Sequence, residues 1–136
     1  MASGIYTSFK EYAGDATVDL DTHTFKVALM NNTHSFSAAN STWANVSANE
    51  ISGTGYTAGG TTLNTITWAA DGTTLKWDAA DSAWTSASFT AYHAVIYDDT
   101  HASDALVCSF DFGGAQTVNN GTFTLQWNSD GILRSS

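Results

Sequence analysis

The sequence predicts an all-β fold: a single antiparallel β-sandwich, of jelly-roll or immunoglobulin-like type, with a short helix near the N-terminus. Three observations support this prediction. Apolar and polar residues alternate along several short segments, which is the period of a strand with one buried face. These segments recur roughly every 8 to 12 residues, with Gly, Asn and Asp between them. The length of 136 residues suits one domain, residues 1–136, and a hydrophobic fraction of 43% supplies its core.

A short helix is predicted over residues 6–12. Ser8 stands where a capping residue would accept a backbone N–H, and Glu11 follows three positions later, as in a capping box. Gly14 comes soon after and is expected to end the helix, because glycine readily adopts the left-handed conformation of a helix C-terminus.

Strands are predicted wherever apolar residues recur at every second position. Residues 24–30 show this pattern, with Phe25, Val27 and Leu29 on one face. Residues 92–97 are apolar on both faces, as expected for a central strand that is covered on both sides. Further strands are predicted at residues 66–68, 75–77, 87–89, 106–112, 122–127 and 132–134. Turns between strands are predicted at Asp71-Gly72, Asn120-Gly121 and Asp130-Gly131.

The predicted core follows from the phases of these strands. Side chains that share a strand face with apolar neighbours should point inward. The residues expected to be mostly buried are Phe25, Val27, Leu29, Trp68, Trp77, Ile96, Phe110, Phe123, Leu125 and Trp127. Cys108 lies in the strand 106–112 and is the only cysteine, so we expect a buried thiol and no intramolecular disulfide.

Two segments lack a clear period. Residues 31–49 are polar, and Phe36, Trp43 and Val46 are their only large apolar side chains. The spacing of Trp43 and Val46 fits one helical turn after Ser41, and it fits a packed loop equally well. A long segment without secondary structure of its own is unusual in a compact domain. We therefore expect Phe36 and Trp43 to anchor this segment into a neighbouring protein.

Residues 51–63 form a glycine-rich segment around Tyr56. It contains Gly53, Gly55, Gly59 and Gly60. A phosphate-binding loop would end in Lys followed by Ser or Thr and would lead into a helix, and neither feature is present. The glycines are therefore predicted to permit bulges and turns.

The charge balance excludes some classes of partner. The net charge is −9, and the only basic residues are Lys10, Lys26, Lys76 and Arg134. Nucleic acid binding requires Lys and Arg to neutralise phosphates, so we expect no nucleic acid partner. No apolar run has the length of a membrane span, so no membrane partner is expected. Charged residues make up only 12%, and uncharged polar side chains suit surfaces that meet other proteins.

The titratable residues do not form a recognisable catalytic or metal-binding pattern. None of the four histidines has ligand spacing to another His or Cys. His101 shares one loop with Ser103 and Asp104, whereas a catalytic triad draws its members from separate rigid elements. Asp98, Asp99 and Asp104 do not match the calcium-loop spacing, and a solvated acidic loop is expected. We therefore expect a protein that is not an enzyme, with no cofactor, no metal and no small-molecule substrate.

Four segments resemble a family of small structural proteins of tailed phages and prophages. The first is Asp19-Leu20-Asp21-Thr22 leading into residues 25–29, and the second, the most distinctive, is the run 50–60 with the sequence EISGTGYTAGG. The third is residues 94–100, AVIYDDT, and the fourth joins residues 110–113, FDFG, with residues 121–127, GTFTLQW, and residues 131–133. Together they span nearly the whole chain in order.

The resemblance implies a virion component, most simply a head cement or decoration protein on the exterior of the phage head. Such a protein would stabilise the head through contacts with the major capsid protein and with copies of itself, as a trimer. A tail, adaptor or fibre-associated virion protein is the alternative. The sequence has no signal peptide, so we expect synthesis in the host cytoplasm.

A carbohydrate-binding module is the competing hypothesis from another class. It would stack sugar rings on an exposed Trp43 or Trp84. For the virion protein, the contact surfaces are expected in residues 31–49, in residues 53–60 and at the termini, because these regions are least committed to the core. The candidate partner contacts are Phe36, Trp43 and Tyr56.

Overall fold

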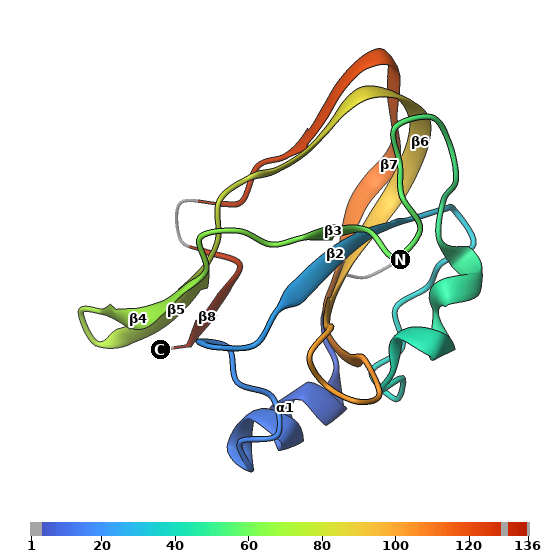
Figure 1. Cartoon of the computed structure of the whole chain (residues 1–136). Coiled ribbons are helices and arrows are strands. Elements are labelled where there is room, and N and C mark those ends of the chain that lie inside the picture. The colour runs from blue at the N-terminus through green and yellow to red at the C-terminus, as the bar shows by residue number, and fades with distance from the viewer. Residues whose placement is uncertain (1–3, 129–130, 136) are drawn as a thin grey trace.

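Two antiparallel β-sheets and a short helix form the fold in the computed structural model, which describes residues 4–128 and 131–135 (Figure 1). The helix α1 covers Thr7–Gly14, and two 3-10 turns follow, η1 (Trp43–Asn45) and η2 (Ser47–Asn49). The strands are β1 (Gly4–Ile5), β2 (Phe25–Met30), β3 (Thr61–Thr62), β4 (Thr67–Asp71), β5 (Thr74–Asp78), β6 (Ser82–Asp98), β7 (Ala105–Leu125) and β8 (Leu133–Ser135). The predicted all-β class with a short N-terminal helix is confirmed.

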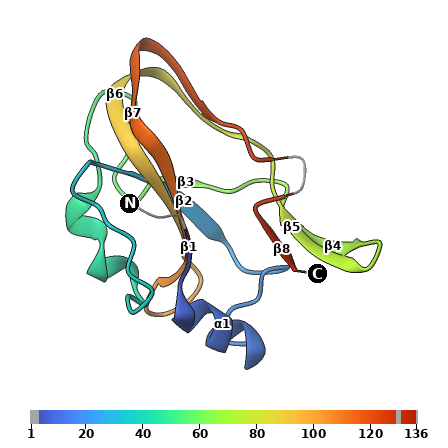
Figure 2. The same cartoon turned by 180° about the vertical axis from the view of Figure 1, so that it is seen from behind.

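The chain passes between the two sheets several times. The larger sheet has the order β1-β7-β6-β2-β3 and the smaller has the order β4-β5-β8. Figure 2 shows α1 directly after β1, at the end of the molecule to which the 99–104 loop also belongs. The amide of Ala80 donates to the carbonyl of Asn64 at 2.8 Å, which joins the β5–β6 connection to the β3–β4 connection where the chain crosses between the sheets. The amide of Ile132 donates to the carbonyl of Trp77 at 2.7 Å and extends the pairing of β5 with β8.

The main core lies between the sheets. The Trp77 ring meets Phe25 edge-on with centroids 5.0 Å apart, and its indole N–H donates to the carbonyl of Leu20 at 3.0 Å. The polar atom of this large side chain is thus satisfied inside the core, as burial of tryptophan requires. The burial predicted for Phe25, Val27, Leu29, Trp77 and Ile96 is confirmed.

A second core lies on the opposite face of the larger sheet. Ala28 and Met30 of β2 are buried there with Tyr6 and Val46. The segment 31–49 covers this face, so β2 is buried on both sides although its sequence alternates. Of the two possibilities left open after Ser41, the structure has the helical turn, η1, capped by reciprocal hydrogen bonds between Thr42 and Asn45.

The outer parts of the sheets are less buried than predicted. Phe110, Phe123, Leu125 and Trp127 are half-buried and pack against the main core. Trp68 is 37% exposed, so its predicted burial is wrong. Its phase was correct, because Trp68 is paired with Trp77 and shares its face. However, β4 is the outer strand of the small sheet and has one open flank.

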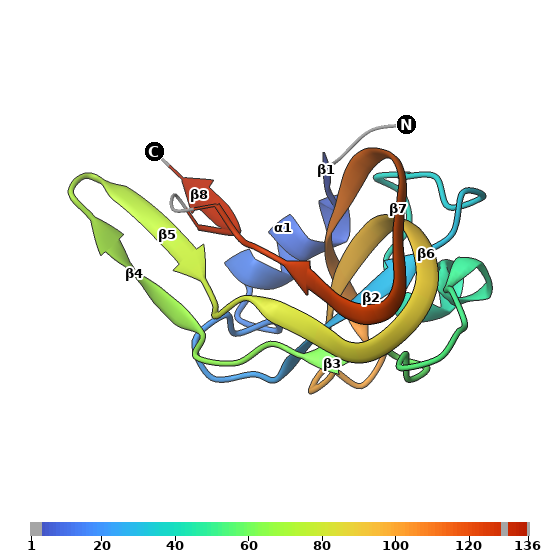
Figure 3. The same ribbon diagram turned by 90° about the horizontal axis from the view of Figure 1, so that it is seen from above.

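β6 and β7 form one long, bent ribbon in place of the separate short strands that were predicted. Seen from above, the two strands curve strongly side by side along their length (Figure 3). The predicted turn at Asn120-Gly121 is wrong, since both residues lie within β7. Asn120 adopts φ +52° and the register with β6 shifts beside it, between Ala87 and Ser88. The Asn-Gly pair thus makes a bulge, because a positive φ bends a strand without reversing it.

The remaining local predictions are largely confirmed. The hairpin turn at Asp71-Gly72 joins β4 to β5, and Gly72 has φ +66°. The last strand begins at Leu133, one residue later than predicted, and Asp130 of the predicted turn lies outside the described residues. The predicted cap of the helix is wrong, because α1 begins after Tyr6 without a side-chain cap and the Ser8 hydroxyl is buried within it.

Candidate interaction surface

Phe36 and Trp43, two of the candidate partner contacts, pack against the protein's own second core. The Trp43 ring stacks on Tyr97 with centroids 4.8 Å apart and an angle of 14° between the planes. The Phe36 ring lies against Tyr6 at 5.0 Å. Both side chains are half-buried. They therefore anchor the segment 31–49 to the sheet beneath it, and their contact with a partner stays a prediction.

Tyr56, the third candidate, is the centre of a hydrogen-bonded knot. Its hydroxyl donates to Glu50 Oε2 at 2.6 Å and accepts the amide N–H of Leu29 at 3.0 Å. The same Glu50 oxygen accepts the amide of Gly59 at 2.7 Å, and the carbonyl of Gly59 accepts the Tyr97 hydroxyl at 2.6 Å. Burial, followed by the hydrogen bond to Glu50, raises the pKa of Tyr56. These hydrogen bonds, which we call the Tyr56 knot, hold the glycine-rich segment against β2.

Close approach to β2 explains one of the glycines. Gly60 has φ +86°, and a Cβ atom there would lie 2.1 Å from the carbonyl oxygen of Val27. Gly55 likewise has φ +80° and runs against the backbone of β6, where a Cβ would lie 2.8 Å from Ala87. These two glycines permit the turns that were predicted, and they also allow the chain to pack closely against β2 and β6. This close approach explains the glycine content of residues 51–60.

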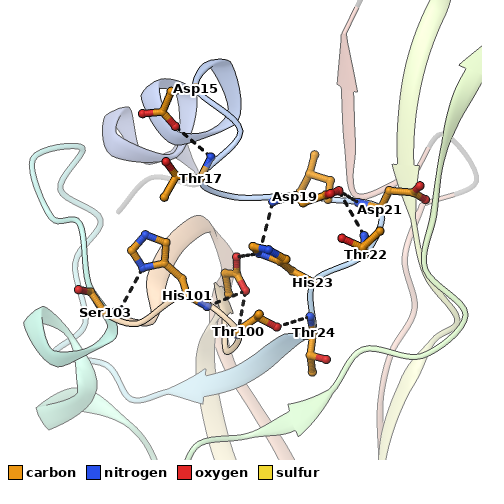
Figure 4. Close-up of polar contacts among 12 residues, drawn as sticks. Asp15, Thr17, Asp19, Asp21, Thr22, His23, Thr24, Thr100, His101 and Ser103 are labelled. Atoms are coloured by element: carbon orange, nitrogen blue, oxygen red, sulfur yellow. Dashed lines mark hydrogen bonds and ion pairs between the residues drawn. The ribbon is translucent and has the colours of Figure 1, made fainter.

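Asp98 is fully buried, so the expectation of a solvated acidic loop is wrong for this residue. Its Oδ2 lies 2.5 Å from Nδ1 of His23, and its Oδ1 accepts the amides of Thr100 and His101 at 2.9 and 3.3 Å. Figure 4 shows this loop facing the segment that leads into β2. The amide of Thr24 donates to Thr100 Oγ1 at 2.8 Å, which joins the two segments. Asp98 therefore organises the loop between β6 and β7.

Neighbouring polar residues form local turns. Oδ1 of Asp19 accepts the amides of Asp21 and Thr22 at 2.9 and 3.3 Å, as Figure 4 shows. Nδ1 of His101 accepts the amide N–H of Ser103 at 3.1 Å. In the part of the chain that the structure describes, no group of three or more His, Cys, Asp or Glu side chains could hold a metal ion. Cys108 is buried as predicted, and burial raises its pKa.

The two tryptophans of the carbohydrate hypothesis are not exposed platforms. Trp84 is only 5% exposed and is enclosed by aromatic neighbours, among them Phe123 at 6.0 Å and Tyr56 at 6.2 Å. One face of Trp43 is covered by Tyr97. A sugar ring stacks on an open aromatic face, so the premise of an exposed Trp84 is wrong.

An apolar groove separates α1 from the small sheet. Its volume is about 340 Å³, and Phe9 and Leu133 lie in its walls. Two exposed apolar side chains line it, Ile5 at 38% and Trp68 at 37%. Exposed apolar side chains that gather in one place are typical of surfaces that bind other proteins. The apolar periodicity of the sequence does not reveal this groove, because its walls come from segments that are far apart in the chain.

The most unusual surface is the far part of the β6–β7 ribbon, which we call the uncharged arc, residues 82–92 and 113–128. Neither segment contains an Asp, Glu, Lys, Arg or His. Its outer side chains are hydroxyls and amides, and Thr90 and Thr117 share a hydrogen bond of 2.9 Å across the ribbon. Seven of the 13 acidic residues lie at the other end, near α1 and the 99–104 loop (Figure 1): Glu11, Asp15, Asp19, Asp21, Asp98, Asp99 and Asp104. Two others flank the arc, where Asp81 Oδ1 accepts the amide of Trp127 at 3.0 Å and Asp111 Oδ1 accepts the amide of Gly113 at 2.8 Å.

One edge of the uncharged arc is open. β7 pairs with β6 on one side, whereas β1 covers its other side only at Cys108 and Ser109. Across the described ranges 4–128 and 131–135, no strand pairs with the outer side of residues 115–125. Charges and proline, two of the devices that protect such an edge, are absent from residues 115–125, and the bulge at Asn120 is the device that remains. An open edge without charge or proline is a template for pairing with another chain.

Comparison of this chain with models of protein families, with curated proteins and with solved structures finds no match. Among the described residues, no helix has the length and apolar character needed to span a bilayer.

Proposed function

We propose that this chain is a structural protein of a tailed-phage virion, a cement or decoration protein that stabilises the head from its exterior. It would act by contact with the major capsid protein and with copies of itself, without catalysis. The observation that carries the proposal is the uncharged arc with its open edge, a surface of the kind that assembled proteins bury.

The distribution of polar groups supports a role in binding proteins. Many carboxylates are engaged in local turns and loops, as at Asp19 and Asp98. The exposed apolar side chains border a groove, where a partner side chain would be buried. The charge-poor surface lowers the desolvation cost of a protein contact, because fewer charges lose water.

The resemblance of four segments to small phage structural proteins supports the virion location. Two of these segments have a clear structural role. Residues 50–60 form the hydrogen bonds around Tyr56, and residues 94–100 lead into the loop that Asp98 organises. The resemblance therefore rests partly on residues that maintain this fold. A tail, adaptor or fibre-associated protein is the alternative within the same class.

Copy number and position in the particle test this proposal. We expect quantitative mass spectrometry of purified virions to find the chain in numbers comparable to the major capsid protein, and cryo-electron microscopy to place it on the outer head surface. The major capsid protein and a tail-tube protein from the same particles are the internal standards. A few copies at the tail would favour the alternative, and absence from washed virions would contradict the proposal.

A further inference from the structure

We infer that β7 pairs through residues 115–125 with the same edge of a second copy of this chain, antiparallel, so that two chains join about a two-fold axis. This inference rests on the proposed function, because contact between copies of the chain is part of that function. The inference adds the surface through which the copies meet. It starts from the unpaired outer side of β7 among the described residues.

Charge favours a copy of this chain as the occupant, because the uncharged arc is where two acidic chains repel one another least. Each chain carries −9, so two copies repel one another wherever their acidic residues approach. At physiological ionic strength this repulsion fades over about 8 Å, so charges close to the contact dominate. The uncharged arc lies at the opposite end from the acidic cluster around α1 and the 99–104 loop (Figure 1). A basic partner would instead gain most at the acidic end.

The shape of the edge also fits an added strand. β7 bends at Gly113 and Gly114, with φ +80° and +158°, and again at Asn120. A hollow of about 440 Å³ lies inside this bend, and every residue that lines it belongs to β7, among them Phe112, Val118 and Phe123. A neighbouring strand would find backbone donors and acceptors along the edge and half-buried apolar side chains in the hollow.

Pairing of one edge with itself requires a two-fold axis, because each residue must meet its counterpart in both directions. The expected product in solution is therefore a dimer. A trimer, which the family resemblance implies, requires that β7 pairs with a different edge. The outer strand β4 is the other candidate edge, but it ends in Asp71, so its contact would carry charge.

The test measures mass by sedimentation equilibrium of the full chain at concentrations up to roughly 100 μM, a range that populates contacts of micromolar Kd. We expect a dimer for the wild type. The double variant Thr122→Lys, Thr124→Lys places lysines on exposed positions of the edge, so that the paired region would hold four positive charges. It should raise the dimer Kd roughly tenfold or more. The matched control Thr67→Lys, Ala69→Lys places the same charges on exposed positions of β4 and should leave the Kd unchanged.

Thermal unfolding of each variant separates loss of pairing from loss of folding. A variant that is monomeric yet melts cooperatively supports the inference. A monomeric wild type overturns it, as does a dimer that is insensitive to the β7 lysines. A trimer that the β4 lysines dissociate also overturns it.

Single-cysteine variants check the two-fold geometry. The native Cys108 is buried, so an introduced cysteine at Thr117, Asn119, Thr122 or Thr124 would be the accessible thiol. Under mild oxidation, one of these variants should form a disulfide-linked dimer by itself, because only a residue near a two-fold axis meets its own copy. If none cross-links while a mixture of β7 and β4 cysteine variants does, the two-fold pairing is wrong.

The inference and the proposed function can fail separately. A chain that is monomeric in solution but abundant on heads would overturn the edge pairing and leave the virion role intact. A dimer that the β7 lysines dissociate, in a chain absent from virions, would leave the pairing intact and overturn the virion role.

Discussion

His34 and His93 pack edge-on in the interior, with ring centroids 5.0 Å apart and an angle of 70° between the rings. Nε2 of His34 lies 3.0 Å from the Ser109 hydroxyl, and Nδ1 of His93 lies 3.8 Å from Asp111 Oδ1. Nδ1 of His34 and both ring nitrogens of His93 have no hydrogen-bond partner among the described residues. A charged imidazole would be poorly compensated here, so burial favours the neutral form of both rings.

This pair predicts acid sensitivity. Burial, followed by the nearby His93, lowers the pKa of His34 to about 4, and burial lowers the pKa of His93 against the opposing effect of Asp111. The unfolded chain binds protons near pH 6.5, whereas the folded chain does not, so the free energy of unfolding falls as pH decreases below about 6.5. For His34 the loss continues until about pH 4, at about 1.4 kcal/mol per pH unit for each histidine. Urea denaturation at pH 7.5, 6, 5.5 and 5 measures the slope.

The variant His34→Leu isolates one member of the pair. It removes one titrating group from the interior, so the slope between about pH 6.5 and 5 should fall, by up to about 1.4 kcal/mol per pH unit. Its stability at pH 7.5 also changes, because Ser109 loses its partner, but the slope reports protonation alone. An unchanged slope in this variant would show that other groups cause the acid sensitivity.

Tyr56→Phe should destabilise the protein although it removes only one oxygen atom. The change leaves the amide of Leu29 and the carboxylate of Glu50 without the hydroxyl that joins them. A buried group left unsatisfied costs about 1–3 kcal/mol, and the midpoint of urea denaturation should move accordingly. Tyr92→Phe, on a half-buried tyrosine of β6, is the control. Equal stability of Tyr56→Phe and wild type would contradict the proposed importance of the knot.

Gly60→Ala and Gly72→Ala form a matched pair. Both glycines have positive φ, +86° and +66°, so both substitutions strain the backbone by about 1 kcal/mol or more. Only at Gly60 does the new Cβ collide with backbone, 2.1 Å from the Val27 oxygen, whereas nothing lies within 4 Å at Gly72. We expect Gly60→Ala to lower the melting temperature much more than Gly72→Ala. Similar melting temperatures would show that the glycine-rich segment can move away from β2.

Trp43→Ala should destabilise the isolated domain by about 2 kcal/mol, since the stacked pair with Tyr97 and part of the burial are lost. This contribution to the domain is expected in addition to the partner contact of Trp43, which stays a prediction. Trp68→Ala, on an exposed edge strand, is the control and should cost less. If Trp43→Ala melts like wild type but detaches from heads, Trp43 would serve the partner contact alone.

Local patterns predicted most strands, and longer-range relationships explain the errors. The alternation of residues 122–127 is present, with Phe123, Leu125 and Trp127 half-buried and the residues between them exposed. Trp68 was wrong because exposure depends on the place of β4 in its sheet, which strand phase does not contain. Asn120-Gly121 was wrong because the same dipeptide suits a hairpin turn and a bulge, and only the partner strand decides between them.

The sites were less predictable than the strands. His34 comes from a segment without periodicity, and it meets His93 only because the segment 31–49 folds back over β2. Asp98 was grouped with its acidic neighbours, yet its burial depends on His23, which comes from before β2. The absence of charge from residues 113–128 was visible in the sequence. Its significance for pairing with another chain became clear only from the structure, which shows that the outer side of β7 is open.

The tight connection between β6 and β7 also has a consequence for the order of folding. Asp98 and Ala105 are paired across the short loop 99–104, whereas Ser82 and Leu125, at the far end of the ribbon, are widely separated in the chain. Closing a short loop costs less entropy than closing a long one, so the ribbon should zip from the loop outward. Pairs in the arc should then form last and open first, which amide hydrogen exchange would reveal as protection that declines toward Ser82 and Leu125. A second chain bound along β7 would protect the amides of the arc as well, so the decline in protection should be weaker in the dimer than in the monomer.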